Sequence, residues 1–266
     1  PKLIARGYQV TVVDTLWFGN FLKPHKNLNI LQVDTRNTND IPIRNVDTII
    51  HLASIANDPC GDLNPKLTWE VGALATMQLA DKAVRAGVKQ FIYASSGSVY
   101  GVKKEDQVTE DLELKPISEY NKTKMVAERS LLSYGDKMIV QIVRPATVCG
   151  YSPRQRLDVV VNILTNLAYH KRSVSVFGGK QLRPNIHIED MAKAYEALIL
   201  APKSKVSGEI FNAGYENRSV LELANTVKRV IGNDVNLKFS PTNDNRSYHI
   251  SSKKIKKILD FEPTNT

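Results

Sequence analysis

The sequence predicts an α/β fold with a doubly wound parallel sheet and a smaller α/β lobe in the C-terminal part of the chain. In the first half, short apolar runs of strand length alternate with segments of helical periodicity. This order is typical of strands that pair in parallel, with helices covering the sheet. After Gly150 the elements are shorter and more mixed. We therefore predict a large domain over residues 1–150 and a lobe over 151–266, from which some segments return to the large domain.

The expected strands of the large domain are buried apolar runs, and helical patterns separate them. The strands are Gln9–Asp14, Leu28–Asp34, Asp47–Ala53, Gln90–Ser96 and Met138–Arg144, and the helices are Lys66–Ala86 and Glu119–Tyr134. Parallel strands bring their carboxyl ends to one edge of the sheet. Ligands of such sheets bind at that edge.

The lobe is expected to alternate short helices and strands. The helices are Asp158–His170, one that starts near Glu189, Val220–Ile231 and Ser252–Leu259, and the strands are Val174–Phe177, Glu209–Ala213 and Asn236–Phe239. The sequence contains no internal repeat and no low-complexity segment.

The first residues do not start as a doubly wound sheet usually does. Such a sheet opens with a strand, a glycine-rich turn and a helix, whereas Pro1–Arg6 reads as the tail of a helix that leads into the strand Gln9–Asp14. No G-x-G-x-x-G motif is present. We expect that about 20 N-terminal residues, with the first strand and that turn, precede this sequence in the native protein. We also expect further residues after the final DFEPTNT.

Composition excludes several classes of function. With 42% hydrophobic and 24% charged residues, the chain has the composition of an ordinary globular protein, and no apolar run approaches the ~20 residues that span a membrane. Cys60 and Cys149 are too few for a disulfide framework or a metal site, and they suit a reducing cytoplasm. The net charge is +9, but the lysines are scattered among acids except near Lys253–Lys257. We therefore expect no nucleic-acid partner, but a few arginines for phosphate groups.

Two short motifs carry the chemistry. Tyr120 and Lys124, in ISEYNKTKMVAE, are four residues apart and share one helix face. At ~5 Å and an effective dielectric near 20, the lysine would favour the phenolate by ~3 kcal/mol. Alone, this spacing also describes a solvated surface pair. However, the strand Gln90–Ser96 runs into SSGSVYG at its carboxyl end, which places Ser95, Ser96 and Ser98 near the expected ligand edge.

The combination of S-S-x-x-V-Y-G with Y-x-x-x-K, in which Tyr120 follows Ser96 by 24 residues, resembles the extended short-chain dehydrogenase/reductase family. The resemblance is to its NAD-dependent nucleotide-sugar epimerases and dehydratases, such as UDP-glucose 4-epimerases, and it covers essentially the whole chain. It implies a Rossmann-type NAD-binding domain over 1–150 and a substrate-binding lobe over 151–266. By this resemblance Tyr120 is the acid–base, Lys124 its partner and a ligand of the nicotinamide ribose, and Ser96 the hydroxyl that contacts the reacting oxygen.

The resemblance also assigns cofactor and substrate residues. Those expected to bind NAD are Asp14, Asp34, Thr35, Ala53, Ser54, Tyr120 and Lys124. Asp14 lies at the end of the second family strand, where a carboxylate would bind ribose hydroxyls and repel a 2′-phosphate. Those expected to bind a nucleotide-diphosphate sugar are Ser96, Ser98, Thr147, Arg183 and Arg246. The two arginines of the lobe would bind the diphosphate, since guanidinium groups suit phosphate oxygens.

Two histidines are interpreted as structural. His51 lies at a strand end, and His187 precedes the helix near Glu189. Both occupy positions where packing is the simpler explanation, so neither is expected to be a catalyst.

The residues after Ser96 help to choose among the reactions that the family catalyses. In related 4,6-dehydratases an Asp-Glu pair follows the serine or threonine, and related decarboxylases carry a glutamate nearby, whereas Gly97 and Ser98 have no ionisable group. Gly97 also replaces the cysteine that fucose-synthase-type epimerases use for 3,5-epimerisation. The resemblance therefore favours epimerisation at C4, by transient oxidation to a 4-ketosugar and re-reduction. A 4-ketosugar reductase that consumes NAD(P)H and a non-catalytic NAD-binding relative are the alternatives.

One departure concerns the helix Lys66–Ala86. The family usually has N-x-x-G-T here, but EVGALAT places Gly72 at the asparagine position. We expect a water or a backbone group to take the role of that asparagine. Members of the family are often dimers through the two helices Lys66–Ala86 and Glu119–Tyr134, so a homodimer is expected.

Overall fold

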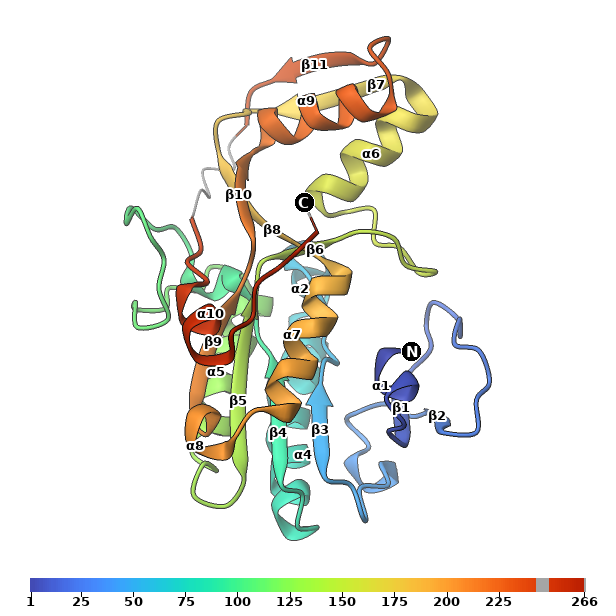
Figure 1. Cartoon of the computed structure of the whole chain (residues 1–266), viewed down its shortest axis with the longest axis vertical. Coiled ribbons are helices and arrows are strands. Elements are labelled where there is room, and N and C mark those ends of the chain that lie inside the picture. The colour runs from blue at the N-terminus through green and yellow to red at the C-terminus, as the bar shows by residue number, and fades with distance from the viewer. Residues whose placement is uncertain (243–248, 266) are drawn as a thin grey trace. The chain divides into compact units, whose positions relative to one another are not determined.

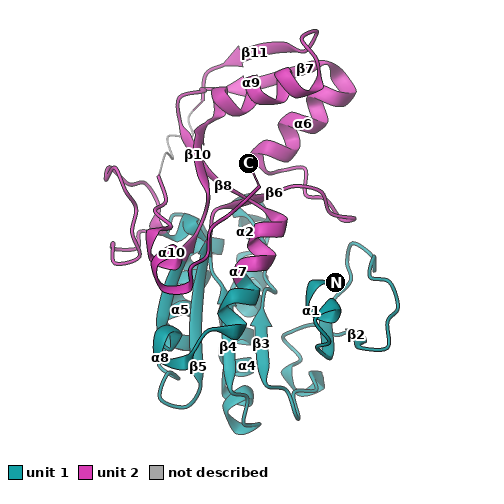
Figure 2. Ribbon diagram, in the orientation of Figure 1, with its two compact units in different colours: residues 1–99, 116–144, 195–211 teal, residues 100–115, 145–194, 212–266 magenta. Residues whose placement is uncertain are grey.

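The computed structural model describes residues 1–242 and 249–265, which divide into two compact units (Figures 1 and 2). Unit 1 comprises Pro1–Val99, Pro116–Arg144 and Tyr195–Phe211, and unit 2 comprises Tyr100–Lys115, Pro145–Ala194 and Asn212–Thr266. The chain therefore passes between the units several times. Within the described ranges, none of the helices combines the length and the apolar composition needed to cross a bilayer.

The main sheet of unit 1 has four strands in the order β3-β4-β5-β9. The strands are β3 (Thr48–His51), β4 (Gln90–Ala94), β5 (Ile139–Pro145) and β9 (Glu209–Ala213). β4 is central and pairs in parallel with both β3 and β5. All five of its residues are buried, because layers of the fold cover both faces of a central parallel strand.

Two further strands of unit 1, β1 (Val10–Asp14) and β2 (Leu28–Gln32), form a separate parallel pair. The predicted α/β class is confirmed. A single doubly wound sheet was expected for the large domain, but the described residues of the whole chain form four separate sheets. In the doubly wound strand order 3-2-1-4-5-6, the first strand joins the two halves. No strand in the described part of the chain takes that joining position between β1 and β3.

Several helices of unit 1 pack against one another. They include α2 (Asp58–Leu63), α3 (Pro65–Trp69), α4 (Ala75–Arg85) and α5 (Glu119–Leu132). The prediction of one continuous α-helix over Lys66–Ala86 is wrong in one detail, because a π-helical turn, η2 (Glu70–Leu74), separates α3 from α4. Gly72 lies in this turn, and a Cβ there would come within 2.6 Å of Thr123 Oγ1 on α5. The missing side chain therefore lets η2 approach α5 closely.

The core of unit 1 lies between α4, α5 and the sheet. Its fully buried members include Ala80 and Ala83 of α4, Phe91 of β4, Leu131 of α5 and Ile142 of β5. The other face of the sheet carries Gln90 and Gln141, which both donate to Leu198 O at 3.0 and 3.2 Å. Alternate strand residues thus face different layers, as a strand buried on both sides requires.

Unit 2 contains two small sheets. One has the order β10-β8-β6, formed by β6 (Thr147–Cys149), β8 (Leu182–His187) and β10 (Glu216–Ser219). The other pairs β7 (Ser173–Phe177) with β11 (Asn236–Ser240) and packs with α6 (Val160–Lys171) and α9 (Val220–Ile231) around a core that includes Ala168, Val176 and Ala224. The remaining elements of the chain are α1 (Lys2–Ala5), η1 (Thr38–Asp40), η3 (Gly97–Tyr100), α7 (Ile188–Leu200), α8 (Lys203–Val206) and α10 (Lys253–Leu259).

Several elements were not expected from the sequence, among them α2, β6, β8 and β10. β8 contains Pro184, which cannot donate to a strand ladder and argues against a strand. β10 has the sequence ENRS, without an apolar alternation. β10 pairs antiparallel with β8, so its polar residues gain backbone partners that no local pattern reveals.

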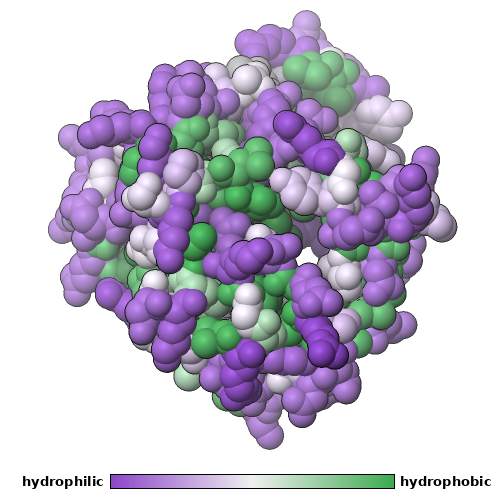
Figure 3. Space-filling model, turned by 60° about the horizontal axis from the view of Figure 1, so that its bottom comes forward, coloured by the Kyte–Doolittle hydropathy of each residue, from purple (hydrophilic) through white to green (hydrophobic). Residues whose placement is uncertain are grey.

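Polar side chains cover most of the face shown in Figure 3, with smaller hydrophobic patches between them.

Candidate active site

The site begins where β4 ends and α5 starts. Ala94 closes β4, and Ser95, Ser96 and the 3-10 turn η3 follow it. The Ser118 hydroxyl accepts a hydrogen bond from the Asn121 backbone N–H at 3.2 Å and caps α5. A capping serine fixes the first helical turn, and Tyr120 lies in that turn.

Lys124 is held beside this strand end. Its side chain is buried, with 2% exposure, and its Nζ donates to Ala94 O at 2.7 Å. The same Nζ lies 4.7 Å from the ring centroid of Tyr93 and 5.8 Å from that of Tyr120. The structure therefore brings the lysine and the tyrosine of the Y-x-x-x-K motif together at the carboxyl end of β4.

Burial changes the protonation of Lys124. Desolvation lowers the pKa of Lys124 to about 7, and the carboxylate of Glu128 opposes this shift. Glu128 is itself held by Arg144, whose Nε and Nη2 donate to its two oxygens at 3.0 and 2.7 Å, and both side chains are buried. Because this pair is bidentate, it fixes the carboxylate one helical turn from Lys124. The charge of Lys124 therefore responds to pH near neutrality.

Ser96 is joined to α5 through Ser98. Ser96 Oγ lies 2.7 Å from Ser98 Oγ, and the Ser98 hydroxyl donates to Asn121 Oδ1. Asn121 Nδ2 in turn lies 3.1 Å from Asp58 Oδ1 on α2. Asn121 and Asp58 were not singled out from the sequence. The available signal was the polar run after β3, which contains Asp58 and lies at the same sheet edge.

The residues predicted to bind the adenosine half of NAD lie at the ends of β1 and β2. Asp14 closes β1, and its Oδ1 accepts from the Leu16 N–H at 2.7 Å. Asp34 is bound by Arg36 in an ion pair of 2.7 Å, and these hydrogen bonds hold the pKa of Asp34 below its usual range. Thr35 is buried, with 8% exposure. These side chains sit where strand ends of such sheets meet a ligand.

The segment after β3 offers an unpartnered polar atom. Ser54 Oγ is buried and has no hydrogen-bond partner, and Ala53 precedes it. A buried hydroxyl without a partner costs free energy unless a bound group satisfies it. Together with Lys124, this hydroxyl provides polar groups that fit NAD at the carboxyl edge of the sheet.

His51 is a packed residue. Its exposure is 4%, and its ring lies 5.9 Å from that of Phe91 and 5.8 Å from that of Tyr93. Its Nε2 is 2.9 Å from Thr76 Oγ1. Burial, aided by the charge of Lys124, lowers the pKa of His51 to about 3. His51 therefore stays neutral at physiological pH.

The predicted substrate residues of unit 2 lie on the β10-β8-β6 sheet. Thr147 of β6 pairs in register with Asn185 of β8, and Arg183 lies two residues before Asn185 on the same face. Arg183 Nη1 donates to Leu182 O at 3.1 Å. Asn185 was not expected from the sequence, yet its Oδ1 is buried without a partner. Arg246 lies outside the described residues.

His187 and Gly150 form a close contact in unit 2. A Cβ at Gly150, whose φ is +110°, would meet His187 Nε2 at 2.6 Å. His187 Nδ1 also accepts from the Glu189 N–H at 3.3 Å at the start of α7. Both contacts are consistent with a structural histidine.

Comparison with known proteins identifies the family. A family model for the NAD dependent epimerase/dehydratase family matches residues 1–214. The chain belongs to this family.

Several relatives of this epimerase/dehydratase chain are known. An uncharacterized UDP-glucose epimerase of Bacillus subtilis (strain 168) is 28% identical over 228 residues, which cover 83% of this chain and 71% of the relative. The crystal structure of UDP-glucose 4-epimerase from Thermotoga maritima with UDP-glucose has a TM-score of 0.89 and 25% identity, and the match covers 100% of this chain and 89% of that chain. MoeE5 in complex with UDP-glucuronic acid and NAD has a TM-score of 0.86 and 25% identity, with the same coverage.

These findings fix the class of enzyme. The family is NAD-dependent, and its fold is the Rossmann-type α/β fold that the sequence predicts. Its members include both epimerases and dehydratases, so the choice between these reactions depends on the residues of this chain.

Proposed function

We propose that this protein interconverts the C4 epimers of a nucleotide-diphosphate sugar. The observation that carries the proposal is the gathering of Ser96, Tyr120 and Lys124 at the carboxyl end of β4 and the start of α5, next to two positions without an ionisable group. Epimerisation by oxidation and re-reduction needs one acid–base and one hydride acceptor, and this set supplies the former beside the expected NAD site.

The residues of the chain have distinct tasks in this proposal. NAD, held by the residues of unit 1, would supply the acceptor and donor of the C4 hydride. Tyr120 takes the proton of the C4 hydroxyl and later gives it back. Lys124, while charged, favours the phenolate of Tyr120, because its Nζ lies 5.8 Å from the ring centroid. Ser96 binds the reacting oxygen and holds C4 in place.

The neighbours of Ser96 disfavour loss of water. Dehydration needs an additional acid and base at the sugar ring, and Gly97 and Ser98 cannot provide them at neutral pH. The Ser98 hydroxyl is also committed to Asn121. Gly97 and Ser98 therefore supply no second acid–base group for dehydration.

The two units take different ligands in this proposal. Asp14, Asp34, Thr35, Ala53 and Ser54 of unit 1 bind NAD, with Asp14 selecting against a 2′-phosphate. In unit 2, Thr147 binds the sugar nucleotide, and Arg183 and Arg246 bind its diphosphate. The residues 1–150 and 151–266 thus approximate the cofactor and substrate domains. The two thiols, Cys60 and Cys149, are unpaired, which fits a cytoplasmic protein.

The test is an assay of the protein, with its native termini, against UDP-, GDP-, CDP- and dTDP-sugars without added reductant. We expect one pair of C4 epimers to interconvert by NMR with no net formation of NADH. Oxidation of NADH by a supplied 4-ketosugar, without interconversion, would instead identify a reductase. The absence of both reactions would favour a non-catalytic NAD-binding protein.

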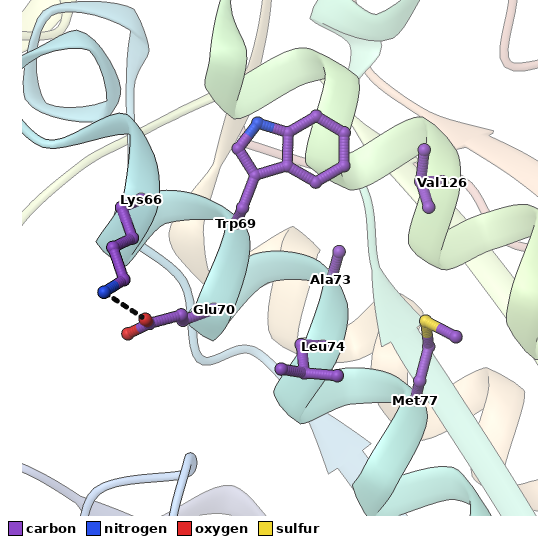
Figure 4. Close-up of a pocket in the computed structure, with 7 residues that line it drawn as sticks. All are labelled: Lys66, Trp69, Glu70, Ala73, Leu74, Met77 and Val126. Atoms are coloured by element: carbon purple, nitrogen blue, oxygen red, sulfur yellow. Dashed lines mark ion pairs between the residues drawn. The ribbon is translucent and has the colours of Figure 1, made fainter.

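We also propose that two copies of the chain associate through α3, η2, α4 and α5. A pocket of about 340 Å³ lies on these helices, lined by Lys66, Trp69, Glu70, Ala73, Leu74, Met77 and Val126 (Figure 4). Leu74 and Met77 are 50% and 39% exposed. Lys66 and Glu70 form an ion pair of 3.9 Å at its edge. An apolar surface with a polar border is typical of a protein interface.

Sedimentation of two matched variants tests this association. Met77→Lys would place a charge in the centre of the contact, and we expect it to sediment as a monomer while the wild type is a dimer. Val230→Lys, which changes a 74% exposed residue of α9, should leave the dimer intact. A wild-type monomer at all concentrations would rule out the association.

A further inference from the structure

Lys124 keeps its ammonium group inside the protein, although burial disfavours the charge. The side chain is 2% exposed, and desolvation lowers the pKa of Lys124 to about 7. The proposed reaction needs this group charged, because only an ammonium favours the phenolate of Tyr120. In the part of the chain that the structure describes, Ala94 O is the hydrogen-bond acceptor of Nζ, at 2.7 Å. One neutral carbonyl gives a buried charge limited support, so the other groups around Nζ decide whether Lys124 keeps its proton.

The face of an aromatic ring lies next to this ammonium group. Lys124 Nζ lies over the ring of Tyr93 on β4, 4.7 Å from its centroid, and 5.8 Å from the centroid of Tyr120. The negative face of a ring attracts a cation within about 6 Å, most strongly where water is excluded. Tyr93 is 0% exposed. Its ring therefore stabilises the charged form of Lys124.

The neighbours of Tyr93 fix the orientation of its ring. Tyr93 pairs in register with His51 of β3, and the two rings stack with centroids 5.8 Å apart and planes inclined by 28°. The ring is also part of the core of unit 1. Among the described residues, the Tyr93 hydroxyl has no hydrogen-bond partner. The contact with Lys124 is therefore made by the ring face and not through a hydrogen bond of the hydroxyl.

Several titratable groups around Lys124 and Tyr120 carry no charge. Burial lowers the pKa of His51 to about 3, so its ring is neutral in the working range of the enzyme. Burial raises the pKa of Tyr93 well above its usual range, and it also raises the pKa of Tyr195 on α7. Tyr93 therefore acts on Lys124 as a neutral ring and not as an anion.

The charged groups near Lys124 are Glu128 of α5 and Arg144 of β5. The carboxylate of Glu128 favours the charged form of Lys124. However, Arg144 Nε and Nη2 donate to both oxygens of this carboxylate, at 3.0 and 2.7 Å. The positive charge of the guanidinium offsets part of the field of the carboxylate. The pair therefore leaves a substantial part in stabilising Lys124 to the ring of Tyr93.

We propose that Tyr93 is a positioning residue whose ring face keeps Lys124 in its charged form and so supports the phenolate of Tyr120. The consequence for catalysis rests on the proposed function, whereas the effect on Lys124 belongs to the protein without substrate. A ring with less negative charge on its face would let Lys124 release its proton at lower pH. Since Lys124 works only while charged, the alkaline limit of the reaction would then move to lower pH.

The first test replaces the ring of Tyr93 by rings of similar shape and decreasing negative charge on the face. Tyr93→Phe is the reference, and a monofluorinated and a trifluorinated phenylalanine then replace Tyr93. Fluorine withdraws electrons from the ring face and hardly changes the size of the ring, so the packing is kept while the attraction weakens. The titration of Lys124 is followed in the free protein by the NMR chemical shift of its labelled Cε. We expect its midpoint to fall stepwise, by about one pH unit for the trifluorinated ring.

Phe91 gives a matched control for this series. It lies on the same strand and sheet face as Tyr93 and is equally buried. Within the described residues, no cation lies over its ring. A trifluorinated phenylalanine in place of Phe91 should leave the titration of Lys124 unchanged.

Three results of these titrations would overturn the proposal. One is a Lys124 titration that is the same with every ring in place of Tyr93. Another is an equal shift when Phe91 is the residue that is fluorinated. The third is a shift in Tyr93→Phe as large as that of the trifluorinated variant, because the hydroxyl and not the ring would then act on Lys124.

The consequence for the reaction is tested with the nucleotide sugar that the wild type interconverts. We expect the alkaline limit of kcat to fall with fluorination by the same amount as the midpoint of the Lys124 titration. Below that limit, kcat should stay within about twofold of that of Tyr93→Phe, because the charged form of Lys124 is then restored. A merely structural role of Tyr93 would instead lower kcat at every pH, without following the charge on the ring face.

Failure of this inference and failure of the proposed function give different results. If the wild type interconverts no sugar although the titration of Lys124 follows fluorination, the proposed function fails and the action of Tyr93 on Lys124 stands. If the wild type interconverts C4 epimers but the alkaline limit does not follow fluorination, the proposed function stands and the role of Tyr93 is overturned.

Discussion

The proposed catalytic end of unit 1 and the β10-β8-β6 sheet of unit 2 place their side chains in different ways. In unit 1, Lys124 is buried and bonded to Ala94 O, and Ser96 is held through Ser98 and Asn121. In unit 2, Thr147 and Arg183 are half-buried and are positioned by strand register. The first region controls protons as well as positions. The second places half-buried side chains on two neighbouring strands of a small sheet.

The difference follows from the tasks proposed for the two regions. Proton transfer requires groups with defined protonation and hydrogen-bond direction, and burial supplies both at a cost in stability. Recognition of a diphosphate requires cations that solvent and ligand can reach. We therefore expect changes in unit 1 to alter kcat, pH dependence and stability, and changes in unit 2 to alter binding.

The largest expected effect is that of Tyr120→Phe. Removal of the phenol removes the proposed acid–base, so kcat for epimerisation should fall by about 10³-fold. NAD binding, measured by calorimetry, should be nearly unchanged because the ring remains. Retained turnover would assign the acid–base to another group and would weaken the contrast between the two regions.

The next effect concerns the close packing of η2 on α5. Gly72→Asn restores the asparagine usual in the family, but a Cβ at this position would lie 2.6 Å from Thr123 Oγ1 and 2.9 Å from its Cβ. We expect the free energy of unfolding in urea to fall by ~2–3 kcal/mol, as for other overpacked sites.

Two further variants control this experiment. Thr123→Ala combined with Gly72→Asn should recover part of the loss, because it removes the nearer atom. Gly135→Asn, where the nearest atom to a Cβ is Leu132 O at 3.3 Å, should cost much less. A Gly72→Asn protein as stable as the wild type would show that η2 can move away from α5.

Local sequence pattern was enough to place the proposed catalytic residues near one another, and their roles stay predictions. Ser96 and the Tyr120–Lys124 pair lie in two motifs, each of which crosses a strand end or a helix start, so local pattern places them near one edge. The role of Gly72 was not predictable in the same way. That a water or backbone group replaces the missing side chain stays a prediction, and the structure adds that Thr123 lies against this position.

Features that depend on distant partners were missed. Asp58 and Asn121 are 63 residues apart, and only the packing of α2 on α5 brings them together. β10 is a strand because β8 pairs with it, and Asn185 gains its place on the sheet from Thr147. Periodicity reports on burial within one segment, so it cannot detect pairing between polar segments.

The pH dependence of the free energy of unfolding also distinguishes the two regions. Burial lowers the pKa of His51 to about 3, so the unfolded chain, with a histidine pKa near 6.5, binds the proton first. The stabilisation is complete above pH ~6.5 and is lost as the pH falls towards 3. We expect the free energy of unfolding to fall by ~2 kcal/mol between pH 7 and pH 5.

Denaturation of His51→Gln in the same buffers gives the control. Glutamine can keep a hydrogen bond to Thr76 but does not titrate. The variant should therefore lose most of this pH dependence. If His187→Gln instead abolished the pH dependence of the free energy of unfolding, the pH-sensitive region would be unit 2.

The smallest expected effect lies in unit 2. Arg183→Lys keeps the charge but removes the planar fork that binds two phosphate oxygens, so KM for the sugar nucleotide should rise about tenfold while kcat stays within twofold. Arg229→Lys, an exposed change on α9, should alter neither constant. A fall in kcat at constant KM would mean that Arg183 acts on the transition state. The division between a region for chemistry and a region for binding would then be wrong, because a half-buried arginine of unit 2 would take part in the chemical step.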